Sequence, residues 1–228
     1  MKNYARSKLI RILMITVLFV LCISRNAFAA LDLEKVTTTF DRECEAAAKK
    51  LKDSIDRAAE SIRRRKDLDG VTKQQYVDYA NEMKANFEKH GYVPMAAFVR
   101  EFTIIYLKEH RQARAKATQA YSVAIDLAIK MNDQQRASKL LSDQKEKMGP
   151  PVICKIDCTG QSFRRRWNWA LKADGSIEGS AATWNFEDNE LVIRNRKYID
   201  KFKVHESGKS FIARNQFAGI YSGNMIYP

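Results

Sequence analysis

The apolar residues between Leu33 and Lys66 recur in steps of three, four and four residues. This pattern repeats every eleven residues, or about 3.67 residues per turn, which is close to the period of an unstrained α-helix. We therefore expect a long, nearly straight hendecad helix over residues 33–66. Its apolar stripe consists of Leu33, Val36, Phe40, Cys44, Ala47, Leu51, Ile55, Ala58 and Ile62.

A second helix is expected between two glycines. Gly70 interrupts the first helix. Thr72, with Gln75 three residues later, forms a capping box that favours a new helix start. Gly91 supplies a usual C-terminal stop.

The eleven-residue period returns over a second long helix, about residues 95–130. Two of its repeating positions, Ala113 and Ala124, are alanine, so a partner helix is able to approach closely there. A short fourth helix follows, capped by Asn132 or Asp133. The simplest packing pairs the two long helices antiparallel and places the shorter helices against them.

After Gly149-Pro150-Pro151 the period of the apolar residues changes to two, which is typical of β-strands. One face of the first expected strand carries Phe163, Arg165, Trp167, Trp169 and Leu171. Further strands are expected over residues 182–186, 191–194, 198–204, 211–215 and 220–226. Asp174-Gly175 is a strong hairpin turn. The pattern predicts an α+β fold with an N-terminal antiparallel helical hairpin or bundle and a C-terminal small antiparallel β-barrel or sandwich.

The first 29 residues have the pattern of a bacterial secretory signal peptide. A basic start precedes an unbroken apolar run, Ile12 to Ile23, and Ala27-Phe28-Ala29 is a small-x-small cleavage site. A transmembrane anchor needs about 20 apolar residues. Because the run is shorter, we favour cleavage after Ala29 over a retained anchor.

This interpretation sets the domain organisation and the expected location. We expect a signal peptide over residues 1–29, a helical domain over 30–148, a linker over 149–158 and a barrel over 159–228. The protein is expected to be exported, to the periplasm or the extracellular space. Its contact with a membrane would then be limited to the signal peptide before cleavage.

The chain is basic, with 40 Lys and Arg, 27 Asp and Glu, and a net charge of +13. The first 29 residues hold five cations and no acid, so the net charge of the remainder falls from +13 to +8. This balance favours anionic surfaces or polymers, whereas export argues against a nucleic-acid role. We expect an unknown protein or an anionic envelope polymer as partner, with a homo-oligomer as a further option.

Three cysteines remain after cleavage, namely Cys44, Cys154 and Cys158. An odd number leaves at least one thiol unpaired within the chain. Cys154 and Cys158 can form a disulfide only if a turn brings them together, because their Cα atoms lie too far apart on a continuous strand. Cys44 falls on the apolar stripe of the first helix and is interpreted as a buried free thiol.

Several short segments occupy turn and core positions of the expected barrel. They are Trp167-Asn168-Trp169, Ala173-Asp174-Gly175-Ser176-Ile177, Ala182-Thr183-Trp184, Leu191-Val192-Ile193 and Gly219-Ile220-Tyr221-Ser222-Gly223. With these segments, residues 159–226 resemble a small lipocalin-like β-barrel module of secreted bacterial proteins. The helical half is similar to helical regions that accompany such barrels. The resemblance implies an extracytoplasmic module, and ligand binding only by analogy with lipocalins.

Trp167, Trp169 and Trp184 are expected on the inward face of the barrel, where they would line a pocket for a small apolar or sugar-like ligand. The alternative, which we favour, is that they fill the interior, because a small barrel is just wide enough for its side chains. Arg165 and Asp200 share the inward parity, and an inward polar group must be paired or functional. An Arg165–Asp200 ion pair would bind a carboxylate-bearing ligand or close the barrel floor.

A compact basic cluster, Arg63, Arg64, Arg65 and Lys66, ends the first expected helix. One interpretation is docking to anionic envelope polymers or lipid head groups. The other, which we favour, is that cations are stabilised at a helix C-terminus by the helix dipole.

The motifs that usually reveal catalysis are absent from the sequence. The three histidines, His90, His110 and His205, follow no metal-ligand spacing. There is no Gly-x-Ser-x-Gly elbow and no phosphate-binding glycine loop. We therefore expect no catalytic residues, no metal and no cofactor.

The most direct hypothesis is a non-enzymatic extracytoplasmic interaction or scaffold protein, in which a helical stalk carries the barrel as a docking module. Hydrophobic residues left exposed on the long helices would favour it. The first alternative is a lipocalin-like binder of a small ligand, which needs a cavity in the barrel. The second alternative is a hydrolase with an unrecognised site, which needs a nucleophile beside one of the three histidines.

Overall fold

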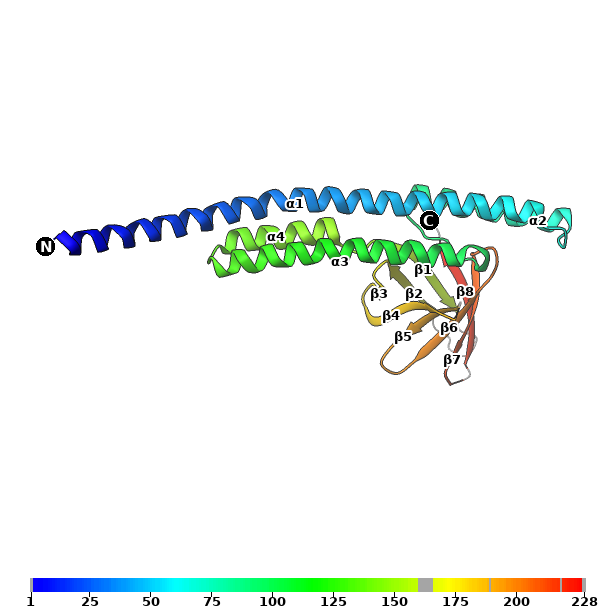
Figure 1. Cartoon of the computed structure of the whole chain (residues 1–228). Coiled ribbons are helices and arrows are strands. Elements are labelled where there is room, and N and C mark those ends of the chain that lie inside the picture. The colour runs from blue at the N-terminus through cyan, green and yellow to red at the C-terminus, as the bar shows by residue number, and fades with distance from the viewer. Residues whose placement is uncertain (1, 160–165, 189, 218, 227–228) are drawn as a thin grey trace. The chain divides into compact units, whose positions relative to one another are not determined.

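The computed structural model describes residues 2–159, 166–188, 190–217 and 219–226, with side chains from residue 33 onward apart from those of Thr159 and Arg166. Helices precede strands, which confirms the α+β layout predicted from the sequence (Figure 1). The helices are α1 (Lys2–Arg64), α2 (Gly70–His90), the 3₁₀ turn η1 (Ala97–Val99), α3 (Arg100–Lys130) and α4 (Gln134–Met148). The strands are β1 (Val152–Thr159), β2 (Arg166–Lys172), β3 (Ser176–Ile177), β4 (Ser180–Glu187), β5 (Glu190–Arg194), β6 (Ile199–Val204), β7 (Ser210–Asn215) and β8 (Ile220–Ile226).

Side-chain and glycine caps fix the ends of the shorter helices. The Asp69 carboxylate accepts hydrogen bonds from the Thr72 backbone N–H at 2.9 Å and from the Thr72 hydroxyl at 2.6 Å. Asp69 is therefore the N-cap of α2, and the prediction that Thr72 caps this helix is wrong, because the stronger acceptor lies three residues earlier. Gly91 ends α2 in the left-handed conformation, with φ of 71°, as predicted. Asp133 caps α4 by accepting from the Arg136 N–H at 2.9 Å.

The chain forms two compact units that do not follow the order of the sequence. One consists of Met1–Arg42 and Arg114–Gly149, and the other of Glu43–Ala113 and Pro150–Pro228. We call them the helical unit and the barrel unit. The long helices α1 and α3 each contribute residues to both units.

In the helical unit, α4 folds back on the second half of α3. Arg114 Nη1 donates to the Met148 carbonyl at 2.9 Å, and Gln144 Nε2 donates to the Thr118 carbonyl at 3.2 Å. The buried apolar side chains are Phe40, Ala117, Tyr121, Ala124, Ile125, Ala128, Ala137 and Met148. Half of this set is alanine, so the helical unit buries little apolar volume.

In the barrel unit, α1 runs antiparallel to both α2 and α3. Lys84 Nζ lies 2.6 Å from an Asp56 carboxylate oxygen, and Lys50 Nζ lies 2.8 Å from Glu109. Such exposed ion pairs contribute at most about 1 kcal/mol each, so buried apolar surface accounts for most of the packing. The buried side chains of these helices include Ala47, Leu51, Ile55, Ala59, Ile62, Val77, Ala80, Met83, Phe87 and Leu107.

The eight strands close into a barrel in sequence order, with β1 paired to β8 (Figure 1). Every neighbouring pair is antiparallel. Alternate residues therefore face the interior, as the period of two predicts. Buried inward residues include Cys154, Ile156, Cys158, Leu171, Trp184, Leu191, Ile193, Phe202, Val204, Phe211, Ala213 and Met225.

Helices and strands of the barrel unit share one hydrophobic core. The Val93 N–H donates to the Ile153 carbonyl at 2.9 Å, which ties the segment after α2 to β1. Arg111 of α3 donates from Nε to the Ala173 carbonyl at 2.7 Å and lies over the Trp184 ring, 5.3 Å from its centroid. The barrel therefore packs directly against the helices of its unit and is not connected to them by a linker alone.

Two strands were not anticipated from the sequence. Residues 152–158, assigned above to a linker, belong to β1 with Thr159, and Ser176–Ile177 form the short β3. Cys154 and Cys158 lie on the inner face of β1 and are free thiols, as their distance along a continuous strand requires. Cys44, expected to be buried, is half-buried. Phe163, expected on the first strand, lies outside the described residues.

Gly223 provides a test of the barrel packing. It lies on β8 opposite Cys158 and Phe211. A methyl group at this position would overlap the Asp157 carbonyl oxygen and lie 2.5 Å from the Phe211 ring. We expect Gly223→Ala to lower the free energy of unfolding by about 1–3 kcal/mol, measured by urea denaturation. Ser222→Ala, at the exposed neighbouring position, is the control, and equal midpoints for the two variants would contradict this packing.

Candidate functional site

A small polar cluster lies inside the barrel. Asp200 of β6, Tyr221 of β8 and Cys158 of β1 are buried, and the rings of Trp167 and Tyr221 lie 5.4 Å apart. Trp167 Nε1 and the Tyr221 hydroxyl are buried and make no hydrogen bond of standard geometry to any residue that the structure describes. Because a buried polar atom without a partner is costly, this interior cluster is the first candidate site for a bound molecule.

Burial dominates the protonation of the interior cluster. It raises the pKa of Asp200, while the nearby Tyr221 hydroxyl acts in the opposite direction. Burial also raises the pKa of the Cys158 thiol to about 12, with a further contribution from the Asp157 and Asp200 carboxylates. A thiol with this pKa is protonated at neutral pH and is a poor nucleophile. The cluster is thus better suited to hydrogen bonding than to covalent chemistry.

The three tryptophans named above occupy two different environments. Trp167 and Trp169 are half-buried neighbours with ring centroids 6.1 Å apart, and Trp167 reaches the interior cluster through Tyr221. Trp184 is fully buried, its Nε1 donates to the Lys172 carbonyl at 2.8 Å, and Arg111 covers its ring. Trp184 therefore joins the barrel to α3, apart from the other two tryptophans.

The sequence predicts Arg165 as the ion-pair partner of Asp200. Arg165 lies outside the described residues, so the Arg165–Asp200 ion pair stays a prediction. Asp200 itself faces inward, as its parity predicts, between its cross-strand neighbours Ile193 and Asn215.

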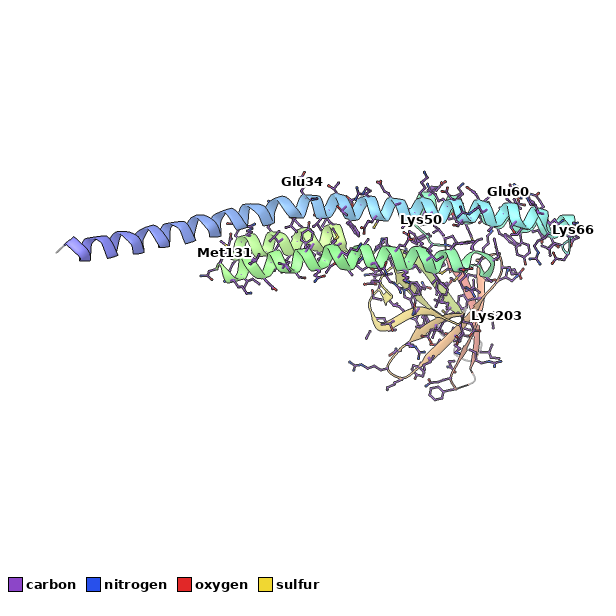
Figure 2. All side chains as sticks on the ribbon, viewed as in Figure 1. Glu34, Lys50, Glu60, Lys66, Met131 and Lys203 are labelled. Atoms are coloured by element: carbon purple, nitrogen blue, oxygen red, sulfur yellow. The ribbon has the colours of Figure 1, made fainter. Side chains whose placement is uncertain are left out.

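The second candidate site is a groove of about 650 Å³ on the outer face of the barrel, which we call the basic groove. Its lining residues are Glu190, Ile199, Lys201, Lys203, Ile212, Arg214, Asn215, Gln216 and Ile220. Lys201 and Arg214 are direct cross-strand neighbours. Lys203, which is labelled in Figure 2, lies two residues further along β6. Among the described residues, no carboxylate lies within 4 Å of these three cations.

The sequence signal for the basic groove was weak. Lys201 and Lys203 alternate with inward residues on one strand, and Arg214 alternates on another. Such alternation describes any solvated strand face. Only the register of β6 and β7 shows that the cations are neighbours.

The predicted anionic-surface cluster, residues 63–66, is partly neutralised. Arg63 pairs with Glu60, and Arg65 Nε donates to Asp67 at 3.0 Å. The other two cations of the cluster are exposed at the end of α1. Its role in binding anionic polymers stays a prediction.

The histidines lie in separate places. His90 ends α2, and His110 is buried on α3. His205 Nδ1 lies 2.9 Å from the Ser207 hydroxyl in the β6–β7 hairpin. This contact closes the turn, because the Ser207 N–H also reaches Nδ1 and the Ser207 hydroxyl accepts from the Lys209 N–H.

A third candidate surface is an exposed apolar row on α3 in the helical unit. Val123 and Leu127 lie four residues apart on α3, and Met131 follows one residue beyond its end. The Met131 N–H still donates to the Leu127 carbonyl at 3.0 Å, so the three side chains lie on one face. Val123 is 55% exposed, Leu127 39% and Met131 52%. We call them the α3 apolar face; Met131 is labelled in Figure 2. A groove of about 390 Å³ borders this face and is lined by Leu33, Val36, Lys116, Gln119, Ala120, Val123, Ala124 and Leu127.

No protein-family model, curated protein or solved structure matches this chain significantly. Within the described ranges, no helix is both long and apolar enough to cross a membrane. The same residues contain no group of three or more His, Cys, Asp or Glu side chains placed to hold a metal ion. The function must therefore be argued from the geometry of the three candidate surfaces.

The raised pKa of Asp200 makes a prediction about stability and pH. The folded state binds a proton at Asp200 more readily than the unfolded chain, so ionised Asp200 lowers stability as pH rises through and above its ordinary value of 3.8. We expect Asp200→Asn to be more stable than the wild-type chain at neutral pH. The difference should shrink towards zero in acid below the ordinary pKa of Asp.

The measurement is urea denaturation at neutral and acidic pH. Asp126→Asn, an exposed position on α3, is the matched control. A stability difference between Asp200→Asn and the wild-type chain that is independent of pH would contradict the proposed effect of burial.

Proposed function

We propose that this chain is a non-enzymatic extracytoplasmic interaction protein, in which the helices bind another protein and the barrel is a docking module. The α3 apolar face carries the proposal. Three large apolar side chains in a row, each more than a third exposed, are typical of a surface that another molecule covers.

The surroundings of the α3 apolar face favour a helix as the binding partner. Two alanines of the bordering groove, Ala120 and Ala124, leave room for a second helix to approach the α3 backbone. An amphipathic helix laid in an apolar groove is a recurrent mode of protein recognition. A helix of a second copy is the occupant to test first, because the chain itself then supplies the partner.

Export is part of this proposal and rests on the sequence pattern of residues 1–29. The lipocalin-like character of the barrel rests on the resemblance given above. The closed eight-stranded antiparallel topology agrees with it. The long hendecad helices would supply the stalk, and the apolar face of α3 its contact surface.

The proposal predicts self-association through the α3 apolar face. Val123→Lys combined with Leu127→Lys places two ammonium groups in the contact, and we expect at least about tenfold weaker association, because burial of such side chains is worth about 1.5–3 kcal/mol each. Sedimentation equilibrium of the full chain over a wide concentration range is the measurement.

Asp126→Lys is the matched control, since it changes the net charge by the same two units at an exposed position on the same helix. A wild-type chain that stays monomeric throughout would count against a second copy as the occupant. Identical behaviour of the double variant and the control would count against the α3 apolar face.

A second function is favoured by the interior cluster. We propose as the alternative that the barrel binds a small molecule that accepts hydrogen bonds from Trp167 Nε1 and the Tyr221 hydroxyl. Trp167 Nε1 has no hydrogen-bond partner among the described residues, and the Tyr221 hydroxyl has only the Asp200 carboxylate nearby, outside standard hydrogen-bond geometry. The surrounding rings of Trp169, Phe202 and Phe211 would contact an apolar or sugar-like ligand.

Native mass spectrometry tests the alternative. We expect a small-molecule adduct on the purified protein that is lost on denaturation and is reduced several-fold in Tyr221→Phe. Tyr198→Phe, at an exposed tyrosine, should retain the adduct. A ligand-free mass for all three proteins would leave the interior cluster without a ligand and contradict this alternative.

A further inference from the structure

The register of β6, β7 and β8 forms two mixed rows of side chains in the basic groove. One row contains Lys201, Arg214 and Ile220, and the next contains Lys203 and Ile212. Like charges in directly opposite cross-strand positions repel each other. The Lys201–Arg214 pair therefore costs stability, and the described carboxylate whose charge acts on it is that of Glu187, which attracts Lys201.

The apolar members of these rows are unusually exposed for their size. Ile212 is 61% and Ile220 54% exposed. Each isoleucine stands directly beside a cation, Ile212 beside Lys203 and Ile220 beside Arg214. A ligand that complements the groove must therefore offer both carboxylates and aliphatic groups.

We propose that the basic groove binds an extended acidic segment of another protein, in which acidic and aliphatic side chains alternate on one face. The two rows are two residues apart along the strands, or about 6.6 Å. Side chains at positions i and i+2 of an extended peptide have the same separation. Such a segment running along the strands brings one side chain to each row.

The charge of the chain decides against a second copy in this groove. With a net charge of +13 overall, or +8 without the first 29 residues, a second copy is repelled by the three cations. A purely anionic polymer would satisfy the cations but leave both isoleucines in water. An acidic protein segment with aliphatic side chains fits both requirements.

This inference rests on the proposed role of the barrel as a docking module, and it adds the surface and the chemistry of the partner. The probe is a fluorescently labelled peptide with the repeat Glu-Ser-Leu-Ser, which places Glu and Leu on the same face of an extended chain. A second peptide with Leu replaced by Ser has the same charge. Binding to the full chain is measured by fluorescence anisotropy.

We expect the leucine peptide to bind more tightly than the serine peptide. Lys201→Gln combined with Arg214→Gln should weaken its binding about tenfold, as expected for two exposed charge contacts. Lys155→Gln combined with Lys197→Gln removes the same charge from exposed positions outside the groove and should have little effect. Ile212→Ser should remove the preference for the leucine peptide.

Three outcomes would overturn the proposal. They are equal affinity for both peptides, equal weakening by the groove pair and the control pair, and tighter binding to heparin or phosphatidylglycerol vesicles than to the leucine peptide. The last would assign the groove to a polyanion or a membrane surface.

The variants of the α3 apolar face separate this inference from the proposed function. Val123→Lys combined with Leu127→Lys should bind the leucine peptide as the wild-type chain does. Loss of peptide selectivity with self-association intact overturns only the basic groove. Absent self-association with selective peptide binding overturns only the role of the α3 apolar face.

Discussion

The hydrophobic core shared by the helices and strands of the barrel unit is the constraint on which the rest of this structure depends. Val93 and Ile153 join the two parts through the backbone, and Arg111 joins them through a side chain. Burial lowers the pKa of Arg111, because its guanidinium gives up hydration where it packs against the barrel. The Ala173 carbonyl and the Trp184 ring offset that cost. This packing holds the barrel against the helices of its unit. It therefore also sets the positions of the interior cluster and the basic groove, which both belong to the barrel.

The barrel separates two kinds of polarity. Its interior holds a few polar groups among aromatic rings, where burial raises the pKa of Asp200 and Cys158 and favours their neutral forms. Its outer face holds cations in water beside exposed isoleucines. Inside the barrel, the free energy of binding would come from hydrogen bonds donated by buried groups that lack a partner of standard geometry among the described residues. In the basic groove on the outer face, the free energy of binding would come from relief of the repulsion between the cations and from burial of the apolar side chains.

The sequence predicted the elements better than their grouping. The change of period at Gly149-Pro150-Pro151 correctly separated helices from strands. Gly91 marked a helix end through its left-handed backbone, and Asp133 marked a helix start through its side-chain cap. β1 was missed, because residues 149–158 were assigned to a linker although Cys154, Ile156 and Cys158 alternate as on a strand.

Other features depend on contacts between distant residues and have no local signal. The division into two units cuts across α1 and α3, whose apolar stripes continue through the boundary. The inward position of Asp200 followed from parity alone, whereas the adjacency of Lys201 and Arg214 required the register of two strands. In the same way, residue order gave no hint that Trp184 would pack under Arg111.

The split of the barrel unit along the chain has a consequence for how the protein is made. Glu43–Ala113 are synthesised before Arg114–Gly149, and the strands come last. The part of their apolar surface that packs against the barrel, Val93 included, therefore stays exposed to water until β1 is made. Folding of the intervening helices shortens the loop that must close. Until β8 pairs with β1, the unfinished sheet also has open edges that invite pairing with other chains. The nascent chain is thus most prone to aggregation just before its last strand is added, which is the stage at which a holding chaperone would have the greatest effect on yield.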